Sequence, residues 1–397
     1  MSTLRIPPVI PSPREDAIKL HKAFKGLGCD TSKVIKILAH RNEEQRSLIQ
    51  QEYETNYSEL FSKRISKELH GHAKKAMTLW LHEPPVRDAK VVRKALRSTP
   101  AVDNHALTET ICSRTPSQLR RLKEVYLSTY QSPLETDIEN HTSGDHKKLL
   151  IAYITTPRYE GPELDPALVE EDAKELYKAG EKRMGTDEKT FIKIFSEKSS
   201  THLTAVNSAY KTSYGHSLEK AIKKETSGSF ASGLLAILRC ATDPALYFAK
   251  ILRKSMKGVG TQDRRLIRVV VTRTEIDMYH IKIAYYKKYG KPLTHAVRSD
   301  TSGHYRDFLL NLIAILYICI FFDGFSNHEC CLTSHEVHLI GGASTDFEGS
   351  LAASASSKKV IIVAPVAKKC KEVMGSSFNY KKVCAKVDVA HIDVVVK

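Results

Sequence analysis

A loop with two glycines and a distant aspartate carries the clearest chemistry in this sequence. Gly258 and Gly260 stand on either side of one residue, and Thr261 begins a run with helical periodicity. Glycine reaches φ > 0 and has no side chain beside its carbonyl, so such a loop can offer several carbonyl oxygens to one cation. Asp300, forty residues after Gly260, would add a carboxylate from a second loop. Ca²⁺ takes carbonyl and carboxylate oxygens in flexible arrangements.

The same pattern recurs in four registers. The four origins, and the residues forty positions after each, are Gly28 with Glu68, Ala101 with His141, Gly185 with Glu225, and Gly260 with Asp300. Two tyrosine columns and one basic column repeat in the same frame, namely Tyr53, Tyr126, Tyr210 and Tyr285; Tyr57, Tyr130, Tyr214 and Tyr289; and Arg41, Arg114, Lys198 and Arg273. A unit of about 75 residues is longer than common solenoid units, so each copy is predicted to be a small helical subdomain.

The ends of these columns set the domain boundaries. We expect a short N-terminal segment at 1–13, repeats at 14–81, 86–154, 166–238 and 243–314, and a linker at 155–165. Residues 315–397 show no repeated column and form an atypical C-terminal extension. The apolar run 309–322 is shorter than the ~20 residues of a membrane-spanning helix. We expect it to be an over-long last helix that packs on the repeats, and residues 360–363 to form a short strand.

Four copies, a glycine loop, an acidic residue forty positions later and a basic residue between them resemble the annexin family. The resemblance covers residues 13–314. It implies an all-α fold, in which four repeats of about five helices each form a curved disc with calcium sites on its convex face. It also implies calcium-dependent binding to anionic phospholipid membranes. Intact first and fourth loops beside damaged second and third loops are similar to the plant branch of the family.

The candidate calcium ligands follow from the first and fourth loops. They are the carbonyls of Phe24, Gly26 and Gly28 with the carboxylate of Glu68, and the carbonyls of Met256, Gly258 and Gly260 with the carboxylate of Asp300. So few protein ligands would leave coordination positions to water, which a lipid phosphate oxygen can displace. Linkage then predicts weak calcium affinity without lipid and stronger affinity with it. The alternative is that the glycines only form a turn between helices and that Asp300 is a helix N-cap.

The other two loops depart from this pattern. In the second repeat Thr99 and Ala101 replace the glycines and His141 replaces the acid, so no calcium is expected there. In the third repeat Gly185 and Glu225 remain as weaker candidates. Arg183 stands where the first glycine should be, and its guanidinium should oppose a divalent cation or reach a lipid phosphate itself.

Composition favours an acidic partner and a reducing compartment. The 397-residue chain has a net charge of +16, which attracts anionic lipid, nucleic acid or acidic protein. Its basic residues are scattered and aromatic stacking motifs are absent, so no nucleic acid is expected. Eight cysteines without a C-x-x-C pair and a start without an apolar signal region predict a cytoplasmic protein, associated peripherally and reversibly with membranes.

Several functional alternatives remain beside membrane binding. Ile267-Arg268-Val269 is close to a motif proposed for actin binding in plant relatives, although a core segment with one exposed arginine is favoured. A peroxidase role has been suggested for relatives at the position of His40, but this lone histidine has no haem-binding pattern. Nucleotide-hydrolase, metalloprotease and hydrolase motifs are absent, so an enzyme is not expected. Self-association on membranes stays open.

Smaller expectations concern the residues around the loops. Thr186 and Thr261 are expected to cap the helices that follow them. Cys29 takes that place in the first repeat, where Asp30 would move the cap by one position and the cysteine could have a lowered pKa, although an inert replacement for threonine is favoured. The repeated basic column is expected to make structural hydrogen bonds or ion pairs to neighbouring loops.

Overall fold

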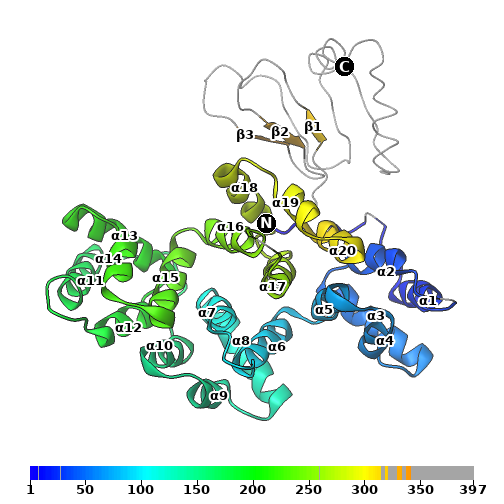
Figure 1. Ribbon diagram of the computed structural model, residues 1–397, viewed down its shortest axis with the longest axis horizontal. Coiled ribbons are helices and arrows are strands. Elements are labelled where there is room, and N and C mark those ends of the chain that lie inside the picture. Colours follow the sequence, from blue (N-terminus) through cyan, green and yellow to red (C-terminus); the bar gives the residue numbers. More distant parts are fainter. Residues whose placement is uncertain are drawn as a thin grey trace, which may run out of the picture. The chain divides into compact units, whose positions relative to one another are not determined.

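The computed structural model describes residues 1–7, 9–26, 28–258, 260–313, 318–320, 329–332 and 337–340. The chain divides into two compact units, Met1–Ala314 and Ile315–Lys397. The first unit holds twenty α-helices, five in each repeat, in the part of the chain that is described (Figure 1). The all-α prediction of about five helices for each of four repeats is therefore confirmed.

The first two repeats hold ten of these helices. Repeat 1 contains α1 (Pro13–Ala23), α2 (Thr31–Leu38), α3 (Glu43–Tyr57), α4 (Phe61–Glu68) and α5 (Gly71–Trp80). Repeat 2 contains α6 (Pro84–Leu96), α7 (Asn104–Cys112), α8 (Pro116–Tyr130), α9 (Leu134–His141) and α10 (Gly144–Thr155). Several helices begin with proline, which lacks the N–H that a first helical residue would leave unpaired.

The second half repeats this order. Repeat 3 contains α11 (Pro166–Ala179), α12 (Glu188–Glu197), α13 (Ser200–Tyr214), α14 (Leu218–Glu225) and α15 (Gly228–Thr242). Repeat 4 contains α16 (Pro244–Ser255), α17 (Asp263–Arg273), α18 (Met278–Tyr289), α19 (Leu293–Asp300) and α20 (Gly303–Ile313). Among the described residues, no helix combines the length and apolar character needed to cross a membrane.

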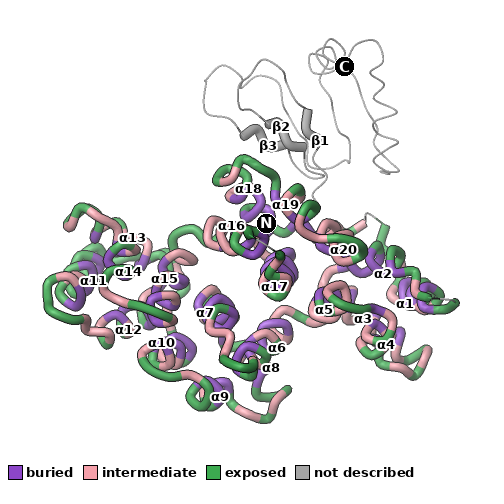
Figure 2. Tube along the Cα trace, in the orientation of Figure 1, coloured by how far each residue is buried: buried purple, intermediate pink, exposed green. Residues whose placement is uncertain are grey.

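The repeats pair to form two hydrophobic cores. Repeats 1 and 4, the most distant in sequence, share one core, and repeats 2 and 3 share the other. In Figure 1 the yellow α20 accordingly lies beside the blue α2 and α5, and these helices are in contact. The four tyrosines Tyr53, Tyr126, Tyr210 and Tyr285 are buried as the core columns predicted, and the buried faces run through both cores in Figure 2. The loops of repeats 1 and 4 therefore rest on one continuous core.

The N-terminal segment joins repeat 4. The backbone N–H of Thr3 donates to the carbonyl of Thr274, and its hydroxyl donates to the carbonyl of Leu312 at 2.7 Å. Thr3 is buried. The segment before α1 is thus part of the structure that repeats 1 and 4 share.

The second unit contains three short strands. They are β1 (Ile318–Ile320), β2 (Glu329–Leu332) and β3 (Val337–Ile340), which form an antiparallel sheet in the order β1-β2-β3. The expectation of an over-long last helix is wrong, because α20 ends at Ile313 and β1 lies within the same apolar run. A short apolar run does not distinguish a helix from a strand by its periodicity. The strand expected at 360–363 lies outside the described residues.

Candidate functional site

Two glycine loops join the first helix of a repeat to its second helix. After α1, Gly26 and Gly28 have φ angles of +117° and +98°. After α16, Gly258 and Gly260 have φ angles of +113° and +80°. A Cβ atom at any of the four would meet nothing within 4 Å, so the requirement for glycine is conformational and not steric crowding. These positive angles confirm the expected use of glycine in both loops.

The two predicted carboxylates end short helices. Glu68 is the last residue of α4, and Asp300 is the last residue of α19. The backbone becomes extended at the next residue in both cases, at Leu69 and Thr301. The interpretation of Asp300 as a helix N-cap is therefore wrong.

In repeat 4 a hydroxyl joins the glycine loop to the acidic residue. The Oγ1 atom of Thr261 lies 2.8 Å from Oδ2 of Asp300 and 2.9 Å from its carbonyl oxygen. A hydroxyl has one hydrogen, so it donates to one of these oxygens at a time. Repeat 3 has the equivalent connection, because Thr186 donates to the carbonyl of Glu225 at 2.7 Å. Both threonines thus bond to the end of a neighbouring helix, whereas their sequence positions predict helix capping.

In repeat 1 an arginine connects the predicted ligands. The Nη2 atom of Arg64 donates to the carbonyl oxygen of Phe24 at 2.8 Å and lies 2.9 Å from Oε1 of Glu68. The Arg64 side chain is 26% exposed and that of Glu68 is 20% exposed. Two oxygens that are far apart in sequence thus meet one positively charged group. The repeat columns did not single out Arg64, although a basic residue four positions before Glu68 on a predicted helix indicates an ion pair.

The third loop retains the backbone shape but has additional cations. Gly185 has a φ of +78°, as the loop pattern requires. The Arg183 side chain is half exposed, and its Nη1 lies 3.9 Å from Oδ2 of Asp187. The Lys224 Nζ atom lies 3.5 Å from Oε1 of Glu225, the predicted ligand. Two positive side chains near this loop are unfavourable for a divalent cation.

The second loop has no carboxylate at the equivalent helix end. His141 ends α9, and its Nδ1 lies 2.8 Å from the carbonyl oxygen of Asp137. The Asp137 carboxylate accepts a 2.5 Å hydrogen bond from the Tyr126 hydroxyl and pairs with Arg93. The Asp137 carboxylate is therefore already paired with side chains of its own repeat. The expectation that the second loop binds no calcium stays a prediction.

In repeats 3 and 4 the N-cap position lies one residue after the threonine that was expected to fill it. The side chains of Asp30 and Asp187 cap α2 and α12, and Gln262 precedes α17 without a side-chain cap bond. The capping role predicted for the two loop threonines is wrong, whereas the cap shift to Asp30 is confirmed. Burial raises the pKa of the Cys29 thiol, so the reactive, low-pKa alternative for this cysteine is contradicted.

The repeated basic column has a structural role, as predicted, but its partners lie mainly on helices. Arg41 pairs with Asp16 of α1. The equivalent pairs in repeats 2 and 3 are Arg114 with Asp88 of α6 and Lys198 with Asp172 of α11. In repeat 4 Arg273 pairs with Asp277 and lies over the ring of Phe248. Charged pairs with their hydrogen bonds satisfied hold each repeat together from inside.

Arg268 is buried, which corrects the expectation of an exposed arginine in the Ile267-Arg268-Val269 segment. It is 6% exposed, and its Nε and Nη2 atoms donate to the Glu109 carboxylate on α7 at 2.8 and 2.7 Å. The pair joins repeat 4 to repeat 2. A guanidinium that is committed to this bidentate pair is not presented to a protein partner such as actin.

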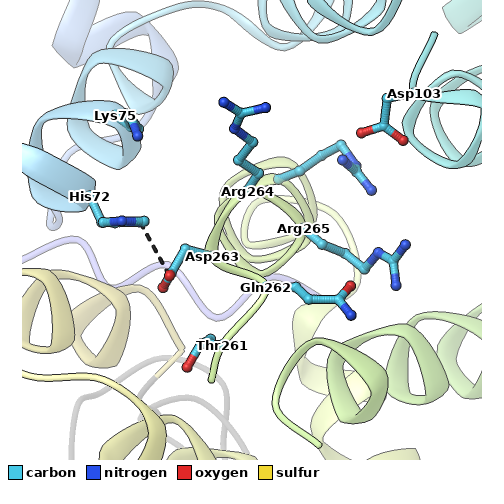
Figure 3. A pocket seen from close by; sticks show the side chains of 9 residues that line it. His72, Lys75, Asp103, Thr261, Gln262, Asp263, Arg264 and Arg265 are labelled. Carbon is cyan, nitrogen blue, oxygen red and sulfur yellow. Dashed lines mark ion pairs between the residues drawn. The ribbon is translucent and has the colours of Figure 1, made fainter. Parts of the chain in front are cut away.

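The catalytic alternatives gain no support from the side chains around them. The His40 Nδ1 atom lies 2.9 Å from the carbonyl oxygen of Lys36, and burial lowers the pKa of this histidine. A pocket of about 330 Å³ lies beside the fourth loop, and its lining includes Thr261, Asp263 and the cations Arg264 and Arg265 (Figure 3). Opposite charges stand side by side in this lining, where the Nδ1 atom of His72 lies 3.5 Å from Oδ2 of Asp263.

The donor set of the first loop fits a hard cation. Within the described residues no group of three or more His, Cys, Asp or Glu side chains could hold a metal ion. The glycine loops instead combine backbone carbonyls with one carboxylate, which are oxygen donors that Ca²⁺ accepts. The contact of Arg64 with both Phe24 and Glu68 demonstrates that a carbonyl and the carboxylate reach one positive group together.

Comparison with known proteins agrees with this architecture. The family model described as Annexin matches residues 15–80, 87–153, 171–237 and 247–312. Annexin D5 of Arabidopsis thaliana is 54% identical over 313 residues, which cover 79% of this chain and 99% of that protein. Human Annexin A4 is 40% identical over 298 residues, which cover 75% of this chain and 93% of that protein.

Solved structures give the same result. The structure titled Annexin III matches with a TM-score of 0.76 and 35% identity, covering 79% of this chain and 96% of that one. The calcium-bound structure of annexin (Sm)1 matches with a TM-score of 0.70 and 28% identity, covering 80% and 94%. The four repeats, their helices and the relatives agree over the same residues, and the chain belongs to the annexin family, which is known for calcium-dependent phospholipid binding.

Proposed function

We propose that this annexin docks reversibly on anionic phospholipid membranes through Ca²⁺ held at the loops of repeats 1 and 4. The residues that would hold the ions are the carbonyls of Phe24, Gly26 and Gly28 with Glu68, and the carbonyls of Met256, Gly258 and Gly260 with Asp300. When bound, Ca²⁺ would supply open positions for lipid phosphate oxygens. We place the protein in the cytoplasm as a peripheral membrane protein.

The observation that carries this proposal is the convergence of Phe24 and Glu68. Their oxygens lie 2.8 and 2.9 Å from the same Arg64 nitrogen, although Phe24 follows α1 and Glu68 ends α4. A carbonyl oxygen and a carboxylate oxygen that already lie close to one positive group support a cation site at this position. In repeat 4 the link between Thr261 and Asp300 supports the same arrangement.

A membrane surface suits the loops better than a soluble phosphate. The chain carries a net charge of +16, which attracts an anionic surface. In the third loop Met184 is fully exposed, and it follows the half-exposed Arg183 in the chain. An apolar side chain next to a cation matches the boundary between lipid phosphates and acyl chains. In this proposal Gly185 and Glu225 form at most a weaker calcium site, because Lys224 and Arg183 stand close by.

Vesicle co-sedimentation tests the proposal directly. The full chain is mixed with phosphatidylserine vesicles, with calcium or with a chelator, and actin filaments are pelleted in a parallel series. We expect calcium to bring the protein down with phosphatidylserine but not with phosphatidylcholine alone. Pelleting with actin that is independent of lipid, or lipid binding that is unchanged by the chelator, would contradict the proposed function.

A further inference from the structure

The first loop already contains a cation supplied by the protein itself. Arg64 stands one helical turn before Glu68 on α4, and the two side chains form an ion pair. The same guanidinium nitrogen donates to the carbonyl of Phe24 at the start of the glycine loop. Both oxygens are among the calcium ligands of the proposed function. The role inferred for Arg64 rests on that function.

This guanidinium is incompletely satisfied where it lies. The Nε atom of Arg64 is buried and has no hydrogen-bond partner. Its Nη1 atom lies 3.7 Å from Oε2 of Glu59, which is longer than a hydrogen bond. A buried N–H group without a partner costs free energy. The position of the guanidinium in the loop is therefore less favourable than it would be with every donor bonded. The Oε1 atom of Glu59 accepts a hydrogen bond from Lys67 at 2.8 Å, and its Oε2 atom is the oxygen toward which the Arg64 side chain can turn.

The fourth repeat has no such residue. The position one turn before Asp300 on α19 is Ala296, whose methyl group carries no charge and cannot donate a hydrogen bond. The contact that Asp300 makes is the neutral hydroxyl of Thr261. Among the differences between the two complete loops is therefore this position one turn before the acid, which is cationic in repeat 1 and apolar in repeat 4.

We propose that Arg64 is an internal competitor for the first calcium site. Its guanidinium must leave Phe24 and Glu68 before their oxygens can serve another cation, and Glu59 then receives it. The fourth site, without a competitor, loads at lower calcium than the first. The protein thereby acquires two calcium thresholds, and full membrane attachment through both loops requires the higher one.

Calorimetric titration of the full chain separates the two sites. The substitutions Glu225→Gln and Asp300→Asn together leave only the first loop able to bind. In that background we expect Arg64→Gln to lower the calcium concentration for half-saturation about tenfold, which corresponds to about 1.4 kcal/mol. The matched control is Lys63→Gln, which removes the same charge from the neighbouring exposed residue and should leave the midpoint unchanged.

The reciprocal substitution tests the same idea in repeat 4. In a Glu68→Gln and Glu225→Gln background, Ala296→Arg should raise the calcium midpoint of the fourth loop, whereas Ala296→Gln should not. The ¹⁵N resonances of the Arg64 side chain provide a second readout, because they should shift as the first site is saturated and stay unchanged with magnesium.

The outcomes distinguish this inference from the proposed function. Equal midpoints with and without Arg64→Gln, or no binding at the first loop after that substitution, would overturn the role of Arg64. Calcium binding at the fourth loop would still stand in that case. Loss of all calcium binding by the unsubstituted chain would instead overturn the proposed function and this inference together. Circular dichroism of each variant confirms that the helices are retained.

Discussion

The hydroxyl of Thr261 lies 2.8 Å from Oδ2 of Asp300, so one hydrogen bond spans the glycine loop and the end of α19. The two residues come from different helix connections of repeat 4. In the proposed function, a carboxylate that is already held toward the loop would need less ordering when a cation binds. Thr261, whose position predicts a helix cap, thus contacts the carboxylate of the candidate site instead.

Replacing this threonine should weaken the fourth site. We expect Thr261→Val to raise its calcium midpoint about fivefold, because a net contribution of about 1 kcal/mol is typical for one hydrogen bond. The measurement is calorimetric titration in a Glu68→Gln background. Thr186→Val removes the equivalent hydroxyl in repeat 3 and is the matched control, for which no change is expected. A midpoint unaffected by Thr261→Val would show that the hydroxyl does not organise the site.

Removing both carboxylates should abolish most calcium-dependent membrane binding. Glu68→Gln and Asp300→Asn each replace the single carboxylate expected at a loop with a neutral amide of similar shape. The expected result is loss of most calcium-dependent pelleting with phosphatidylserine vesicles, with the helical circular dichroism signal retained. Unchanged pelleting by a folded double variant would refute the assignment of these residues as calcium ligands.

A buried histidine predicts a loss of stability in mild acid. His146 on α10 is buried, its Nε2 lies 2.9 Å from the Thr108 hydroxyl, and burial lowers its pKa to about 4. The unfolded chain, with a pKa of about 6.5, binds the proton more readily. The contribution is therefore fully present above pH 6.5 and is lost as the pH falls toward 4, by about 2 kcal/mol at pH 5.

Urea unfolding at pH 7 and pH 5, both without calcium, measures this difference. The free energy of unfolding should fall less between these two values in His146→Gln than in the unsubstituted chain. The exposed His295 offers a control, since His295→Gln should follow the unsubstituted protein. An equal fall in all three proteins would mean that protonation of His146 does not contribute.

Much of the site could be predicted because the repeats keep one register. Gly28, Gly260, Glu68 and Asp300 are identified by residue type and spacing, which do not depend on how the repeats pack. The shared core of repeats 1 and 4 has no such signal, since apolar faces do not specify their partners. For the same reason Arg268 was expected to be exposed. Its partner Glu109 comes from another repeat, 159 positions away.

Arg64 shows a different limit of the sequence pattern. It has no counterpart in the other repeats, where Asp137, Ala221 and Ala296 hold the same position, so comparison of the copies gave it no weight. Its pairing with Glu68 follows the ordinary helical spacing of four residues. The bond to the Phe24 carbonyl depends on where α4 lies against the loop, which only the packed structure provides.

The second unit should be dispensable for calcium-dependent lipid binding. The residues Met1–Ala314 form one compact unit, and Ile313 is buried in the core that repeats 1 and 4 share. Both candidate sites lie within this unit. A chain that ends after Ala314 should therefore pellet with phosphatidylserine vesicles at the same calcium midpoint as the full chain.

The lysines and arginines of the removed segment should affect only the pelleting with vesicles that occurs without calcium. Each basic residue near an anionic surface adds about 1 kcal/mol of attraction, and added salt screens it beyond ~10 Å at about 0.1 M. We therefore expect the truncated chain to lose at most a calcium-independent, salt-sensitive fraction. Unfolding of the truncated chain would mean that residues after Ala314 complete the core. A folded chain that no longer responds to calcium would mean that they help to build the sites, and the proposal that repeats 1 and 4 suffice would fail.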